Sequence, residues 1–222
     1  VVVGGSGDDE LTSATTAAQS GRLYYVLGGA SNSTDFSSIT LGAITPTHFK
    51  GGLSDGFLAT LTWQSAGWPY LTVGFVGGTG DDRITALAAW YTNVAFTGTT
   101  TSPDLSVKRA FQPAPAGGVD GFTGSMTAGA YDIYISYLSY LGGSGDDRPT
   151  GIAYVRSGGA VVVGGETGSA DFPLTTEDKL SGPTDAFLSR ILVSNVSQPE
   201  LNVSRLFGGS DRDAILSLAS PQ

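Results

Sequence analysis

The chain has 222 residues, with 33 glycines, 10 prolines and no cysteine. Charged residues make up only 14% and the formal net charge is −9. This composition excludes disorder driven by high charge, argues against a nucleic-acid partner and excludes disulfides and thiolate metal sites. No apolar run approaches the ~20 residues of a membrane-spanning helix, so no membrane span is expected.

A glycine-acid turn recurs along the chain, and two further anchors follow it in a fixed order. The turns are Gly4–Asp9, Gly77–Asp82, Gly142–Asp147 and a degenerate Gly208–Asp213. The second anchor is Asp35-Phe36, Asp104-Leu105 and Asp171-Phe172, and the third starts at Asp55, Asp120 and Asp185. Anchors that stay in phase predict equivalent structural units. We expect a single repeat domain over residues 1–222, with repeats at about 4–76, 77–141 and 142–207, a partial fourth repeat at 208–222 and an N-terminal strand at 1–3.

Each unit is predicted to contain four strands. β-branched and aromatic residues bounded by glycine and serine are typical of hairpins. The expected strands are Leu11–Ala18, Arg22–Leu27, Phe57–Trp63 and Leu71–Val76, then Ile84–Trp90, Val94–Thr97, Phe122–Ala128 and Tyr131–Leu141, then Thr150–Val155, Ala160–Val163, Phe187–Val193 and Leu201–Phe207. Four strands in about 65 residues match a propeller blade better than a sandwich. The predicted fold class is therefore all-β, a propeller-type array of about three four-stranded antiparallel blades with spare terminal strands.

The third unit contains sequence motifs that resemble a known repeat family. Its stretches Tyr140–Asp147, Val161–Pro173 and Asp185–Leu188 resemble the SBBP repeat, the "seven-bladed β-propeller-like" repeat of bacterial and archaeal secreted and surface proteins. The resemblance covers essentially the whole chain, but the second unit departs from it at Ser102–Leu105. The resemblance implies an extracellular or cell-surface β-propeller setting, and it implies no catalytic activity.

The two ends of the chain are out of phase with the repeat. Val1–Val3 stands where a fourth strand belongs, and Asp213–Ser220 stands where a first strand belongs. Three blades are too few for a closed ring, since known rings use about four to eight, and an open array leaves unpaired backbone at its edges. The chain is then a piece of a larger propeller, a subunit of a shared ring, or a homo-oligomer formed by insertion of a terminal strand into a neighbour. The candidate self-assembly residues are Val1, Val2, Val3, Ile215, Leu216 and Leu218.

The acidic turns are candidates for Ca²⁺, a cation that binds about 6–8 oxygens. The candidate ligands are Asp8, Asp9, Asp81, Asp82, Asp146 and Asp147. The alternative, which we favour, is that these aspartates accept backbone N–H groups in tight glycine turns, because the sequence has no spaced Asp-x-Asp-x-Asp-Gly loop. No other cofactor is expected.

Aromatic residues and sequons suggest two further kinds of site. Trp63, Trp68 and Tyr70 cluster in the first unit and could stack on a carbohydrate or anchor a surface protein, although large aromatics are more often buried. Asn32, Asn195 and Asn202 stand in N-glycosylation sequons.

An enzyme is the least supported class. Gly52–Gly56 matches the Gly-x-Ser-x-Gly pattern and His48 lies nearby, but a nucleophile elbow needs a strand–turn–helix context. The other units lack the serine, and His48 is the single histidine of the chain. We therefore predict a non-catalytic extracellular structural or adhesive protein, able to assemble into oligomers or filaments. The alternative is a fragment of a larger propeller that binds a carbohydrate or a protein.

Overall fold

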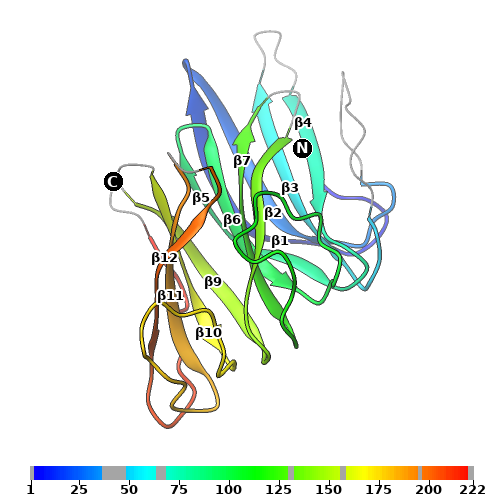
Figure 1. Cartoon of the computed structure of the whole chain (residues 1–222). Coiled ribbons are helices and arrows are strands. Elements are labelled where there is room, and N and C mark those ends of the chain that lie inside the picture. The colour runs from blue at the N-terminus through cyan, green and yellow to red at the C-terminus, as the bar shows by residue number, and fades with distance from the viewer. Residues whose placement is uncertain are drawn as a thin grey trace.

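The described strands form three four-stranded antiparallel sheets, each a meander in chain order (Figure 1). The structure is a computed structural model, and it describes residues 3–36, 49–63, 69–129, 133–155, 159–194 and 197–219. The strands are β1 (Asp9–Gln19), β2 (Arg22–Ser31), β3 (Asp55–Trp63), β4 (Pro69–Val76), β5 (Asp82–Trp90), β6 (Asn93–Thr100), β7 (Asp120–Ala128), β8 (Ile133–Leu141), β9 (Asp147–Tyr154), β10 (Ala160–Thr167), β11 (Asp185–Leu192) and β12 (Glu200–Phe207). These ranges contain no helix. The prediction of an all-β chain with four strands in each unit is confirmed.

The register between the second and third strands is the same in all three sheets, because the repeat anchors fix it. The second strand of each sheet pairs a glycine with the phenylalanine that stands two residues after the third-anchor aspartate: Gly29 with Phe57, Gly98 with Phe122, and Gly165 with Phe187. A glycine leaves room for the ring across the strand pair, since an added Cβ at Gly98 would lie 2.5 Å from the Phe122 ring. Equivalent positions in the three sheets can therefore be compared directly.

The sheets stack face to face in chain order, and their first strands lie next to one another. Strand β1 contacts β5, and β5 contacts β9. Two apolar clusters fill the spaces between the sheets. The first contains Val26, Leu58, Ile84 and Phe96, and the second contains Ala95, Ile152, Val161 and Phe187. We call the spaces between consecutive sheets the first and second junctions.

Each junction is joined by the same two polar contacts. Asp82 donates its N–H to the Ser54 carbonyl in the first junction (2.8 Å), and Asp147 donates to Val119 in the second (2.6 Å). The Thr12 hydroxyl donates to the Ile84 carbonyl (2.6 Å) in the first junction, and Thr85 repeats this contact in the second. The sheets are thus connected by residues that occupy equivalent places in the repeat.

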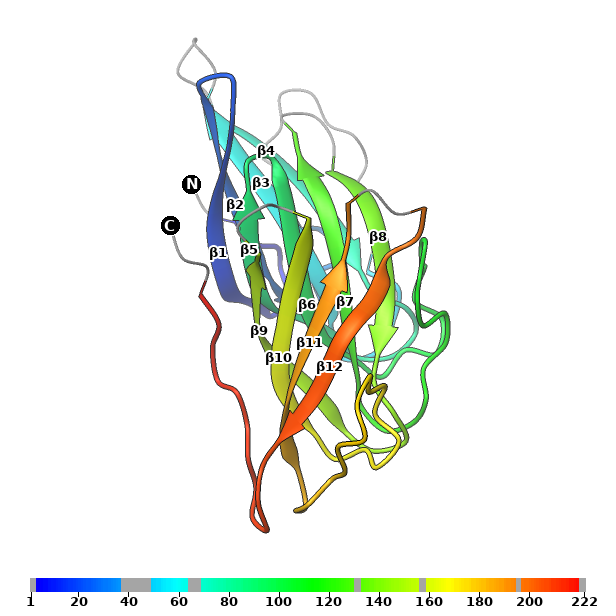
Figure 2. The ribbon, with the colours of Figure 1, turned by 60° about the vertical axis from the view of Figure 1, so that its left-hand side comes forward.

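The segment after β12 docks on the third sheet as β5 and β9 dock on the first two (Figure 2). Asp213 donates its N–H to the Thr184 carbonyl (3.0 Å), and Ile215 donates to Gly165 (3.2 Å). The Thr150 hydroxyl donates to the Ile215 carbonyl. Residues 211–219 thus take the place of the predicted first strand of a fourth unit, but they form no regular strand.

Candidate functional site

The last aspartate of each acidic turn holds the turn together. Asp9, Asp82 and Asp147 each accept the N–H of the second glycine, at 2.7, 2.9 and 2.6 Å. Asp213 does the same for Gly209 at 2.8 Å. Hydroxyl groups complete the arrangement, as where Ser102 donates to Asp82 at 2.6 Å. These are the contacts of aspartates that stabilise a tight turn.

The second anchor fastens the turn to the loop that follows the second strand. Asp35, Asp104 and Asp171 accept the backbone N–H of Ser6, Thr79 and Ser144 at 2.7, 2.8 and 2.8 Å. The hydroxyl of the same three residues also donates to each carboxylate. Hydrogen bonds to the charged form lower the pKa of all three carboxyl groups.

The third anchor is buried and caps the loop before the third strand. Asp55 accepts the Lys50 N–H at 2.6 Å, and Asp120 accepts the Ala116 N–H at 3.0 Å. In each case the other carboxylate oxygen has no hydrogen-bond partner within the described residues. Burial, and secondarily the neighbouring carboxylates of the next acidic turn, raise the pKa of Asp55 and Asp120 to about 6.

A glycine lies between the two buried carboxylates of each junction. A Cβ added at Gly77 would lie 2.4 Å from Asp55 Oδ1 and 2.9 Å from Asp82 Oδ2. Gly142 stands in the same relation to Asp120 and Asp147. The first glycine of the turn is therefore required by the close approach of two side chains.

The first aspartates of the turns, the other candidate calcium ligands, mostly contact backbone and arginine. Asp81 accepts the Leu53 N–H, and Asp146 accepts the Val119 N–H and the Arg148 guanidinium. Asp8 donates its own N–H to the Asn32 side chain. Among the described residues no group of three or more acidic or histidine side chains is placed to hold a metal. Calcium binding stays a prediction.

Part of one face of the first sheet is apolar and exposed. We call it the uncovered face and define it by Leu11, Tyr25, Leu27, Leu61 and Trp63. Leu11, Tyr25 and Trp63 are 57%, 41% and 48% exposed. The Tyr25 and Trp63 rings pack edge to face, with centroids 5.6 Å apart. Another part of the same face is buried, because Val3 and Phe36 pack there against a cluster that includes Phe57.

The uncovered face corresponds to surfaces that are buried in the junctions. Val94 and Val161, at the positions equivalent to Tyr25, are fully buried. Ile84, at the position equivalent to Leu11, is also fully buried. In the second and third sheets this face contacts the preceding sheet. The first sheet thus exposes positions that the other two sheets bury.

The opposite end of the stack is covered in part by the chain itself. Ile215 and Leu218 lie over Gly164, and Ile84 and Leu87 lie over the equivalent Gly28. Leu216 is exposed. Of the remaining predicted self-assembly residues, Val3 packs in the first unit, whereas Val1 and Val2 lie outside the described residues.

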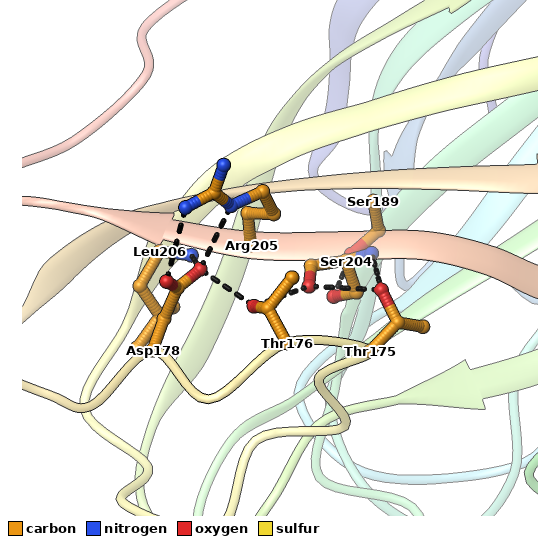
Figure 3. A network of polar contacts seen from close by, with 7 residues as sticks. All are labelled: Thr175, Thr176, Asp178, Ser189, Ser204, Arg205 and Leu206. Carbon is orange, nitrogen blue, oxygen red and sulfur yellow. Dashed lines mark hydrogen bonds and ion pairs between the residues drawn. The ribbon is translucent and has the colours of Figure 1, made fainter.

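The outermost strands of the second and third sheets have covered edges. The loop before β11 bonds to β12 (Figure 3): Thr175 exchanges hydrogen bonds with Ser204, and Asp178 accepts the Leu206 N–H while pairing with the Arg205 guanidinium. In the second sheet Lys108 exchanges two backbone hydrogen bonds with Leu138 of β8. Covered edges do not template the addition of another strand.

The remaining predicted residues are scattered. Tyr70 lies on β4 and is partly buried, and Trp68 falls outside the described residues. Asn32 is used in the first acidic turn, Asn202 is exposed on β12, and Asn195 is not described. The Ser54 hydroxyl donates to the Asp82 carbonyl (3.4 Å) in the turn before β3, and His48 is not described. Sequence reasoning missed Leu11 and Tyr25, which a comparison of equivalent repeat positions could have found.

No helix in the described ranges is long and apolar enough to cross a membrane. No protein-family model matches the chain. Over 98 residues, or 44% of its length, the chain is 35% identical to a protein of Caulobacter vibrioides named "Regulatory protein FlaEY". The aligned stretch covers 9% of that protein, so this chain spans only a small part of its length.

Proposed function

We propose that the chain is a non-catalytic structural or adhesive repeat protein of the propeller type, exposed outside the cell, and that its uncovered face receives another unit of the same kind. That unit belongs to a second copy of the chain or to another segment of the same propeller. The exposure of Leu11 and Tyr25, at positions where the other two sheets bury Ile84, Val94 and Val161, carries the proposal. The resemblance of the repeats to secreted and surface propellers supports the extracellular location.

The two junctions give the geometry of the proposed contact. In the first junction, the face of the second sheet that is equivalent to the uncovered face packs on the first sheet. Its side chains Ile84 and Leu87 lie over Gly28. On the third sheet that place is Gly164, now under Ile215 and Leu218. In a two-chain contact, β1 of one copy displaces residues 213–219 of the other from the third sheet. Such a contact is heterologous and propagates into filaments unless it closes into a ring.

The apolar side chains of the uncovered face supply the driving force. Full burial of a large apolar side chain stabilises a contact by about 1.5–3 kcal/mol. Leu11, Tyr25 and Trp63 together therefore contribute several kcal/mol, less the cost of ordering two molecules. Edge-to-edge pairing contributes less, because the edges of β8 and β12 are already bonded to loops.

Sedimentation velocity over a wide concentration range tests the proposal. The wild type is expected to associate, and Tyr25→Arg is expected to remain monomeric, because it places a charge in the contact. The control is Tyr91→Arg, which changes a ring that is 74% exposed at the turn between β5 and β6. Deleting residues 213–222 should shift the equilibrium toward assembly by freeing the third sheet. Association that is equally strong in Tyr25→Arg contradicts the proposal.

A carbohydrate- or protein-binding module is the second candidate, because the Tyr25–Trp63 pair forms an exposed aromatic surface beside a shallow hollow lined by Arg22 and Leu23. Aromatic rings of this kind stack on sugars. A glycan array with the wild type and Trp63→Ala tests this candidate. Binding that is retained in Trp63→Ala excludes this surface.

A further inference from the structure

A pocket of about 230 Å³ opens between the outer strands of the first two sheets. Its apolar wall comes from two sheets that are distant in sequence. Leu58 and Val76 belong to the first sheet, and Ile133, Ile135 and Leu138 belong to the second. The pocket lies on the far side of the first sheet from the uncovered face, because Leu58 packs in the first junction.

The absence of a side chain at Gly74 of β4 contributes to this space. A Cβ at Gly74 would come no closer than 3.7 Å to its nearest neighbour, Ile133. Ser139 occupies the equivalent position in the second sheet, where it is buried and bonded to the backbone of Gln112. There Phe111 also packs into the second junction. The pocket is therefore a property of the first junction and not of the repeat.

Two of the three lysines in the chain line this pocket. Lys108 Nζ donates to the Ile135 carbonyl at 2.7 Å and lies 4.0 Å from the centroid of the Tyr134 ring. Lys50 Nζ donates to the Gly77 carbonyl at 3.2 Å and to the Ser106 hydroxyl at 3.0 Å. Each ammonium group has three donors, so both lysines keep capacity for an anion.

The charge around the pocket favours an anionic ligand, although the chain as a whole carries −9. The eleven lining residues include two lysines and no aspartate or glutamate. Lys50 interacts electrostatically with Asp55 and Asp104, and these carboxylates reduce the positive charge that Lys50 offers to a ligand. Lys108 forms no salt bridge within the described residues, so it is the principal cation available to a ligand.

We infer that this pocket binds a small amphipathic carboxylate, with its apolar body among Leu58, Ile133 and Ile135 and its carboxylate beside the ammonium of Lys108. At about 30 Å³ for each heavy atom, a value close to the volume of a water molecule, the space holds roughly eight heavy atoms. Hexanoate has this size and is the probe of choice. The inference is independent of the proposed assembly, because the uncovered face contributes no residue to the pocket.

Titration calorimetry with hexanoate tests the inference, and hexan-1-ol serves as the uncharged probe of the same shape. Hexanoate should bind with one site per chain and a Kd of about 1 mM or tighter, which needs only a modest binding energy per heavy atom. Hexan-1-ol should bind at least about fivefold more weakly, because it forms no charge-assisted hydrogen bond. Lys108→Met should weaken hexanoate binding by about fivefold or more and leave hexan-1-ol binding unchanged.

Two further variants control for the place of binding. Gly74→Leu should abolish binding, because its side chain would enter the open space beside Ile133. Lys179→Met removes the lysine that is remote from the pocket and should leave binding unchanged. Circular dichroism verifies that each variant is folded. The inference is overturned by the absence of saturable binding at about 20 mM hexanoate, a regime of negligible affinity, by equal affinity for the alcohol, or by binding that survives Gly74→Leu.

Discussion

Replacement of the buried Asp55 by asparagine should stabilise the protein at neutral and alkaline pH. The side chain is fully buried, and one of its carboxylate oxygens has no partner within the described residues. Asp82 carries a second carboxylate on the other side of Gly77. Asparagine keeps an oxygen that can accept the Lys50 N–H and removes the buried charge.

The size of the effect follows from the pKa of Asp55, which burial and the charge of Asp82 raise from 3.8 to about 6. At about 1.4 kcal/mol per pKa unit, this shift corresponds to about 3 kcal/mol. Because the folded state binds this proton more tightly than the unfolded chain, the charged form destabilises the folded state fully above pH 6. That destabilisation disappears as the pH falls from 6 toward 4.

Urea unfolding followed by tryptophan fluorescence at pH values from 2 to 8, with EDTA present, measures the difference between wild type and Asp55→Asn. We expect the variant to be about 1–3 kcal/mol more stable at pH 8 and to lose this advantage near pH 4. Asp104→Asn is the control with the opposite sign. The pKa of Asp104 is lowered, first by the Thr79 N–H, so its stabilisation is present above pH 4 and disappears below it. A variant less stable than wild type at pH 8, or a difference that does not change with pH, would refute the reasoning.

Three further predictions concern the turns and the edges. Gly77→Ala should destabilise the protein by about 2–4 kcal/mol, because its Cβ would clash with the Asp55 carboxylate. Gly209→Ala, where nothing lies within 4 Å, should have little effect, and chemical denaturation measures both; equal losses would contradict the steric explanation. Asp178→Asn should expose the edge of β12 by weakening its bonds to Arg205 and Leu206, and light scattering on heating should show faster aggregation than in wild type; an unchanged aggregation rate would mean that the loop stays in place without this carboxylate. Calcium at millimolar concentration should leave the Tm unchanged, because Asp9 and Asp147 already accept N–H and hydroxyl donors on both oxygens; a clear rise in Tm would support the calcium site instead.

The repeat anchors made the sheets predictable from the sequence. Each anchor residue has one local role, such as stabilising the acidic turn (Asp82) or capping a loop (Asp120). Short hairpins then pair each strand with the next strand in the chain. The burial of Phe57, Phe122 and Phe187 was predictable for the same reason.

The candidate surfaces were less predictable, because they depend on which sheet lacks a neighbour. Leu11 and Ile84 are equivalent in the repeat, yet one is exposed and the other buried. Gly74 and Lys108 line the same pocket although they belong to different units, and no local sequence pattern predicts that they lie close together. Edge protection by Thr175 and Asp178 likewise depends on a loop folding back on β12.

The glycine-acid turn has a consequence for how such a chain can change in length. The second and third turns each bond within themselves, to the loop of their own sheet and to the loop before the third strand of the preceding sheet. An insertion or deletion of a few residues would break one of these bonds, whereas duplication or loss of a complete stretch from one turn to the next would preserve them all. Genetic lengthening or shortening of this architecture is therefore expected to proceed in steps of one whole sheet.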